Sequence, residues 1–220
     1  METVVLSVTW AIDWMRRTAV LVAAHRSELS ELDRKIGDGD HGENLARGFA
    51  AVVAKLDAQP QPPALVGDVL RTAATTLMST VGGASGPLYG TAFLRASRAS
   101  SRVELDAQGV VVLLEACLEG VRDRGGAQVG DKTMLDAWAP AAEAAARVAA
   151  QGASPADVLR AAALAAREGT AQTAQLTAVR GRASFLGEAS VGVADPGAAS
   201  TALVIEAAHD AAVAAGRWAA

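Results

Sequence analysis

The chain has 220 residues, of which 51% are hydrophobic and only 4% aromatic, and it carries a formal net charge of -4. This composition provides for one large domain or two small ones, with a core built mainly from Ala, Leu and Val. The acidic balance and a pI near 5.4 disfavour nucleic acid as a partner, because no basic field is present to attract phosphate backbones.

Apolar residues recur at helical spacing along most of the chain, and Pro and Gly separate the segments. The strongest run of β-branched residues, Val110–Val112, lies inside a helical pattern. We therefore expect an all-α fold of eight helices in a single domain over residues 1–220. The helices are expected at about 3–28, 42–55, 64–80, 87–100, 104–124, 132–151, 155–178 and 196–216.

The sequence carries no sign of export or of insertion into a membrane. Cys117 is the only cysteine, so no internal disulfide is possible and a reducing cytoplasm is the simplest setting. No basic region precedes an apolar run at the N-terminus, and no apolar stretch reaches the length that a membrane span requires. The expectation is a soluble cytoplasmic protein with no membrane partner.

Between the first two expected helices, residues 33–44 contain Asp33, Asp38 and Asp40 together with three glycines. Crowded carboxylates repel one another unless a cation lies between them, and hard oxygen ligands suit Mg²⁺ better than zinc. The match of residues 37–42 to G-x-G-x-x-G is rejected, because no strand precedes it. A solvated acidic turn is the alternative to a metal site.

Four polar loops, 33–42, 82–87, 125–131 and 181–195, each lie immediately before an expected helix. They follow alternate helices, so in an up-and-down arrangement all four gather at one mouth of the bundle. Helix N-termini offer free N–H donors and the positive end of the helix dipole, which suits phosphate. Together with Mg²⁺, this arrangement predicts a site for a nucleotide polyphosphate and for phosphoryl transfer. Met134, beside the third loop, either contacts an adenine or belongs to the core.

Other polar residues in these loops have more than one interpretation. Ser85, Asp131 and Asp195 are each well placed either to bind a ligand or simply to cap a helix N-terminus. His41 is either a donor to phosphate or an ordinary residue at a helix start. Arg182 either reaches a phosphate or stays in solvent.

Four motifs, at 33–42, 79–91, 130–134 and 181–197, resemble those of the nucleotide-binding L subunit of dihydroxyacetone kinase. The motifs occur in the family's order and the resemblance covers nearly the whole chain. It implies an eight-helix antiparallel up-and-down barrel with the nucleotide at one mouth, in agreement with the position expected for the four loops.

The resemblance also implies roles for individual residues. Asp33, Asp38 and Asp40 would bind two Mg²⁺ ions. The residues that would contact ADP or ATP are His41, Gly42, Asn44, Ala84, Ser85, Gly125, Met134, Arg182, Asp195, Pro196 and Gly197. Among them, Arg182 and His41 would neutralise and align the phosphates, so that the chain need supply neither a base nor a nucleophile.

In this family the ketose is held by a separate K subunit or domain, for which the chain has no room. The resemblance implies a subunit whose bound ADP is recharged by a phosphohistidine-carrying M subunit of the phosphotransferase system. Two alternatives stay open: an ATP-dependent kinase subunit for a related ketose such as erythrulose, and a nucleotide-sensing module that docks on a transcriptional regulator. Association into a homodimer is a further option.

Overall fold

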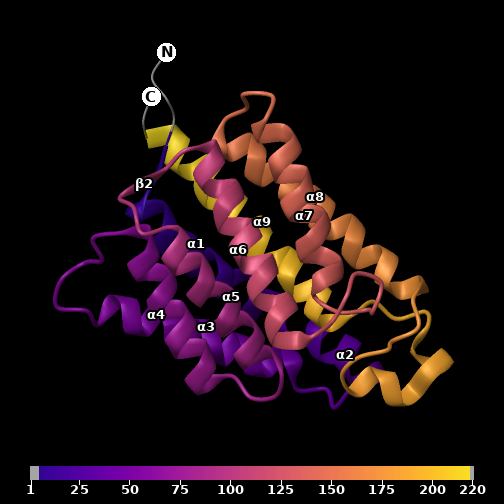
Figure 1. Cartoon of the computed structure of the whole chain (residues 1–220). Helices are drawn as coiled ribbons and strands as arrows, with labels where there is room; N and C mark the ends of the chain where they lie inside the picture. The colour runs from indigo at the N-terminus through magenta and orange to yellow at the C-terminus, as the bar shows by residue number, and fades with distance from the viewer. Residues whose placement is uncertain (1–4, 219–220) are drawn as a thin grey trace.

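The computed structural model describes residues 5–218, which are mostly helical (Figure 1). The helices in this part of the chain are α1 (Val8–Ala24), α2 (Arg26–Ile36), α3 (His41–Asp57), α4 (Val66–Thr80), α5 (Ser85–Ala99), α6 (Ala107–Gly125), α7 (Leu135–Ala149), α8 (Pro155–Gln172) and α9 (Pro196–Trp218). Two 3-10 helices, η1 (Thr173–Gln175) and η2 (Arg182–Ser190), lie between α8 and α9. The all-α class is confirmed. Within these residues no helix combines the length and apolar content needed to cross a bilayer.

The helices follow one another around a ring. Each helix from α3 to α8 packs against the next one in the chain. Helix α1 packs against α3, and α9 packs against α1, which closes the ring. Figure 1 shows α1 and α9, from opposite ends of the chain, in the same layer of the molecule. The helix α2 stands apart from this ring and contacts α3, α9 and η2.

Two tryptophans of α1 join the first and last helices. The indole N–H of Trp10 donates to the carbonyl of Ala208 at 3.0 Å, and that of Trp14 donates to the carbonyl of Val204 at 2.8 Å. The two rings stack with centroids 5.3 Å apart and are fully buried. Many small alanines surround them in a continuous core, which lets the helices approach closely.

The expected first helix, 3–28, is in fact two helices, so the described residues contain nine α-helices and not eight. The break lies at His25, whose ψ of 10° departs from helical values. The helix α2 then continues to Ile36, and only residues 37–40 of the expected acidic loop are non-helical. Apolar spacing did not reveal this break because the backbone hydrogen bonds continue across it, from His25 to Leu21 and from Leu29 to His25.

A short antiparallel pairing also departs from the expected helices. Strand β1 (Leu6–Ser7) pairs with β2 (Glu104–Leu105), so the helix expected at 104–124 begins only at Ala107. The carboxylate of Asp106 caps this helix by accepting from the N–H of Gly109 at 2.7 Å. The sequence did not reveal this pairing, because strands of two residues are too short to show an alternating apolar pattern. The other differences are at helix ends: α7 begins at Leu135, α8 ends at Gln172, and η2 lies within the expected loop at 181–195.

Candidate functional site

One pocket of about 690 Å³ lies where four helices begin. The residues that immediately precede α3, α5, α7 and α9 are Asp40, Ala84, Met134 and Asp195, and all four line it. Each of the four polar loops predicted from the sequence contributes to its walls, so their expected meeting at one mouth is confirmed. A pocket of this size accommodates a cofactor-sized ligand, and helix N-termini favour an anionic one.

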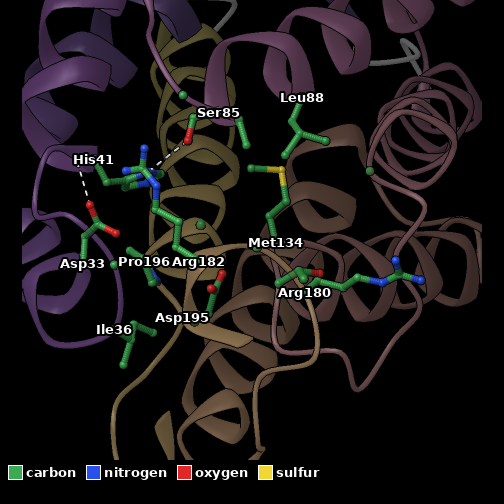
Figure 2. Close-up of a pocket in the computed structure, with 18 of the residues that line it drawn as sticks. Asp33, Ile36, His41, Ser85, Leu88, Met134, Arg180, Arg182, Asp195 and Pro196 are labelled. Atoms are coloured by element: carbon green, nitrogen blue, oxygen red, sulfur yellow. Dashed lines mark hydrogen bonds between the residues drawn. The ribbon is translucent and has the colours of Figure 1, made fainter. Parts of the chain in front are cut away.

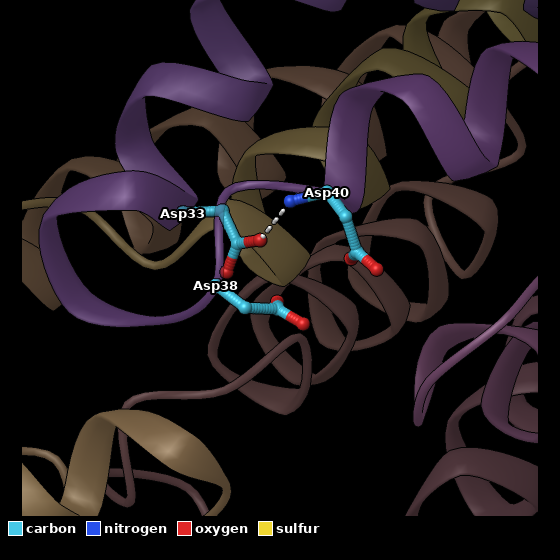
Figure 3. A group of neighbouring side chains, drawn as sticks. All are labelled: Asp33, Asp38 and Asp40. Atoms are coloured by element: carbon cyan, nitrogen blue, oxygen red, sulfur yellow. Dashed lines mark hydrogen bonds between the residues drawn. The ribbon is translucent and has the colours of Figure 1, made fainter.

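Three carboxylates gather at one side of the pocket. Asp33, Asp38 and Asp40 each offer an oxygen, and these atoms lie within 4.8 Å of one another. Figure 3 shows the three side chains converging from the end of α2 and the start of α3. Clustered carboxylate oxygens are the ligands that a hard divalent cation such as Mg²⁺ prefers, so the donor set fits that ion.

The short turn between α2 and α3 fixes Asp33. Its Oδ2 accepts from the backbone N–H groups of Asp40 at 2.9 Å and His41 at 3.1 Å. A Cβ on Gly37 would lie 2.2 Å from Asp33 Oδ1, so a side chain there would displace this carboxylate. The guanidinium of Arg182, whose side chain is largely exposed, pairs with Asp38 across the pocket. A positive group therefore already reaches the carboxylate cluster.

The imidazole of His41 lies buried between two hydroxyl groups. Its Nδ1 is 3.0 Å from Ser85 Oγ and its Nε2 is 2.9 Å from Ser200 Oγ, which is in turn 2.7 Å from the hydroxyl of Tyr89. Burial lowers the pKa of His41 to about 4, although two nearby aspartates oppose this shift. The ring is therefore neutral near pH 7, so it donates to one of the two hydroxyls and accepts from the other.

The start of α5 lacks a side-chain cap. Ser85 is its first residue and hydrogen-bonds to His41. The interpretation of Ser85 as an N-cap is therefore wrong. At α9, by contrast, Asp195 does cap the helix by accepting from the N–H of Ala198 at 2.7 Å. The free N–H groups at α5 are well suited to an anion.

The opposite side of the pocket is apolar. Met134 is almost completely buried, and Figure 2 shows its sulfur directed toward Leu88. Val121, Gly125 and Ala127 line the same region, where α6 ends. A polarisable thioether and small apolar groups suit a flat aromatic ring, while the carboxylates and helix N-termini lie toward the other end.

Every residue that the sequence assigned to metal or nucleotide lines this pocket, with one exception. Those that line it are Asp33, Asp38, Asp40, His41, Asn44, Ala84, Ser85, Gly125, Met134, Arg182, Asp195, Pro196 and Gly197. The exception is Gly42, in the first turn of α3. A Cβ on Gly42 would lie 2.1 Å from the carbonyl oxygen of Arg26, so this glycine serves the contact between α2 and α3.

The sequence interpretation missed supporting residues in the segment 128–136. The carboxylate of Asp136 accepts from the N–H groups of Gly130 at 2.5 Å and Thr133 at 2.7 Å, which shapes the turn before α7. The spacing Thr133-x-x-Asp136 is a capping signal that could have revealed this role. Asp131 does not cap α7; it accepts from the N–H of Gln128 and pairs with Arg180.

Burial raises the pKa of Asp195 to about 7, and the nearby charge of Lys132 opposes that rise. Lys132, also in the turn before α7, lines the pocket and was not among the predicted site residues. Both of its hydrogen-bond acceptors are carbonyl oxygens far away in the sequence, so no local motif announces it.

Fold and pocket together define an all-α protein whose pocket combines clustered carboxylates, which suit a hard cation, with helix N-termini, which suit an anion. The chain belongs to the DAK2 domain family, whose sequence profile matches residues 35–210. This finding confirms the resemblance noted from the four motifs.

Two relatives are similar over nearly their whole length. The PEP-dependent dihydroxyacetone kinase 1, ADP-binding subunit DhaL, of Listeria innocua is 44% identical over 198 residues, which are 90% of this chain and 93% of the relative. The PEP-dependent dihydroxyacetone kinase, ADP-binding subunit DhaL, of Escherichia coli is 40% identical over 91% of this chain and 95% of its own length.

A solved structure is similar in fold. The dihydroxyacetone kinase from C. freundii, crystallised in complex with AMP-PNP and Mg²⁺, superposes with a TM-score of 0.68 and 27% sequence identity. The match covers 92% of this chain but 33% of the C. freundii chain. This chain therefore spans about a third of that enzyme.

Proposed function

We propose that this chain is a single nucleotide-binding domain that serves as the ADP-binding subunit of a dihydroxyacetone kinase. Its activity would be the transfer of a phosphoryl group from Mg²⁺-bound nucleotide to dihydroxyacetone held on a separate K subunit. The observation that carries this proposal is the pocket itself, in which three carboxylates and an uncapped helix N-terminus lie opposite an apolar wall. These features match the cation, the phosphates and the base of a nucleotide.

In this proposal Asp33, Asp38 and Asp40 hold two Mg²⁺ ions, which offset the negative charge of the phosphates. The N–H groups at the start of α5, beside Ala84 and Ser85, bind phosphate oxygens. The carboxylates and this helix start line the same pocket, which supports these two roles. A metal-bound phosphate needs carboxylates to hold the metal and N–H groups to bind its oxygens.

The remaining pocket residues orient the nucleotide. Neutral His41 keeps Ser85 in place, and Asn44 presents its side chain beside the 82–85 turn. Arg182, now paired with Asp38, is free to move to a phosphate when a metal ion takes its place at that carboxylate. Met134, with Gly125, bounds the adenine, and Asp195, Pro196 and Gly197 close the pocket at the start of α9. Alignment and charge neutralisation are then the whole catalytic contribution of the chain.

The proposed phosphoryl donor rests on the relatives that resemble this chain. The PEP-dependent ADP-binding subunits match it over 93% and 95% of their own length, whereas the match covers 33% of the C. freundii chain. We therefore favour a separate K subunit and a tightly bound ADP that an M subunit recharges in the cytoplasm, where phosphoenolpyruvate is available. An ATP-dependent subunit acting on a related ketose such as erythrulose is the alternative.

Identification of the bound nucleotide tests this proposal directly. The protein would be purified, its nucleotide released with acid and analysed, and we expect ADP that exchanges slowly with free ATP. Phosphorylation of dihydroxyacetone and of erythrulose would then be measured with a K subunit and ATP alone, and with K and M subunits, phosphotransferase proteins and phosphoenolpyruvate. Transfer from ATP alone would reject the favoured donor, and failure to bind any nucleotide in the presence of Mg²⁺ would reject the function.

A further inference from the structure

Lys132 combines two features that are unfavourable for a lysine. Its side chain is only 1% exposed, and its φ is 61°, the only positive φ of a non-glycine residue in the part of the chain that the structure describes. Burial of an ammonium group removes its hydration, and an L-residue rarely adopts this backbone conformation. Such features persist only where surrounding contacts compensate for them.

The compensating contacts are two carbonyl oxygens that stand at the two ends of one segment. The ammonium Nζ of Lys132 donates to the carbonyl of Leu176 at 3.0 Å and to that of Ser190 at 2.7 Å. We call residues 176–190 the arginine loop, because Arg180 and Arg182 within it line the pocket. One side chain thus ties together both ends of the arginine loop and joins them to the turn before α7.

The arginine loop also contacts its surroundings at single points. The N–H of Val179 donates to the carbonyl of Asp131 at 3.3 Å, and η2 packs against α2. Ala178 and Ala183 belong to a small apolar cluster with Ile36, separate from the main core. In the ion pairs of this loop the two arginines, Arg180 and Arg182, are more than half exposed, and ion pairs of exposed side chains contribute little to stability. The two charge-assisted hydrogen bonds of the Lys132 ammonium attach both ends of the loop to the turn before α7.

Lys132 also faces a third wall of the pocket. Its positive charge acts on Asp195, which caps the start of α9. A single ammonium group therefore lies among the turn before α7, the arginine loop and the start of α9.

We propose that Lys132 is a positioning residue that anchors the arginine loop, and with it Arg182, over the nucleotide pocket. This inference rests on the proposed function only for its effect on the nucleotide, since the anchoring itself can be measured without any ligand. Lys132 touches carbonyl groups of the protein and acts through the loop that it holds.

The test compares Lys132→Met, which keeps an unbranched side chain but removes its charge and donors, with Lys55→Met at an exposed lysine of α3. Tryptic cleavage after Arg180 and Arg182, followed by mass spectrometry on the folded full chain without nucleotide, should be about tenfold faster in Lys132→Met because the loop opens more often. Release of a fluorescent ADP analogue in the presence of Mg²⁺ should also accelerate, by about tenfold. Equal cleavage and equal release in the two variants would overturn the proposal.

A measurement on the unaltered protein covers the case in which Lys132→Met fails to fold. The chain has three lysines, at 35, 55 and 132, and only Lys132 is buried. In protein labelled with ¹⁵N-lysine, one ammonium signal should exchange its protons with water much more slowly than the other two. Three signals that exchange equally fast would reject the proposal that Lys132 anchors the arginine loop. Absence of nucleotide binding by the wild-type protein would instead reject the proposed function. The cleavage and exchange results would still show whether Lys132 anchors the arginine loop.

Discussion

The carboxylates of the acidic cluster differ in the contacts that they make with the rest of the protein. Asp33 accepts hydrogen bonds from two backbone N–H groups and so supports the turn, whereas Asp38 pairs with the exposed guanidinium of Arg182. Asp38 can therefore be changed with the least effect on folding. For Asp38→Asn we expect the affinity for ADP in the presence of Mg²⁺ to fall by at least ~10- to 100-fold. Substitution of a residue that only supports a metal ligand commonly lowers affinity by this factor, and loss of a proposed ligand itself should lower it at least as much. Isothermal titration calorimetry measures this loss.

The matched control is Asp57→Asn, because Asp57 also forms an exposed ion pair with an arginine, Arg16, far from the pocket. Both substitutions should change the free energy of unfolding by less than about 1 kcal/mol, as is usual for exposed ion pairs. If Asp38→Asn binds Mg²⁺–ADP as well as Asp57→Asn does, the metal-binding role of Asp38 is wrong.

The raised pKa of Asp195 predicts a pH dependence of stability. Its pKa rises from 3.8 to about 7 on folding, through burial and the neighbouring charge of Asp136 against the opposing charge of Lys132. Between these two pH values the folded chain keeps a proton that the unfolded chain has released. The contribution of Asp195 to the free energy of unfolding therefore decreases as the pH rises from about 4 to about 7.

Asp195→Asn removes this titration while keeping an oxygen that can accept from Ala198. Relative to wild type, the variant should become more stable as the pH rises through that range, in protein free of nucleotide and Mg²⁺. Urea unfolding at pH 4.5, 5.5, 6.5 and 7.5, roughly spanning the window between the two pKa values, measures the difference. A difference that does not change with pH would show that Asp195 is already ionised in the folded protein at low pH.

At the scale of helices, the contact between α2 and α3 determines where the carboxylates lie, and it depends on Gly42. A methyl group there would lie 2.1 Å from the carbonyl oxygen of Arg26 and 2.7 Å from Ser30 Oγ, so α2 would have to move. For Gly42→Ala we expect a loss of about 1–3 kcal/mol in the free energy of unfolding, as for other overpacked sites. Weaker binding of Mg²⁺ should accompany it, because Asp33 lies on α2 and Asp40 just before α3.

Gly216→Ala in α9 is the corresponding control. Nothing lies within 4 Å of a Cβ at this helical position, so alanine should stabilise the helix by up to about 1 kcal/mol. Thermal unfolding of the two variants should therefore move in opposite directions. A stabilised Gly42→Ala would mean that α2 and α3 are not packed as closely as described.

The sequence was informative about elements where local chemistry marks their ends. The helices expected from residues 155 and 196 begin at those residues, because a Ser-Pro and an Asp-Pro pair mark their starts. The break at His25 and the pairing of Leu6 with Leu105 were missed, because neither leaves a break in the apolar spacing. The acidic cluster was found because its residues are adjacent in sequence. Lys132 was missed because its acceptors come from a segment that only the tertiary structure brings near.

At the scale of the whole molecule, the proposed reaction requires a second protein at the mouth of the pocket. In the proposed function the pocket holds the nucleotide, and the C. freundii enzyme has about two-thirds of its length outside the region matched here. Phe185, on the arginine loop, is 89% exposed, and Leu186 beside it is 44% exposed. Large apolar side chains next to a functional pocket are typical of a surface that another protein covers.

We therefore expect Phe185→Ser to impair the coupled reaction with the K subunit while leaving ADP binding unchanged. Loss of a buried aromatic anchor commonly weakens an interface by about 2 kcal/mol or more, so the K-subunit concentration for half-maximal transfer should rise by at least ~30-fold. Val20→Ser on α1, at an exposed apolar residue that does not line the pocket, controls for the loss of surface hydrophobicity. Equal coupling by the two variants would place the K subunit elsewhere, whereas loss of ADP binding in Phe185→Ser would show that Phe185 supports the arginine loop and not the partner.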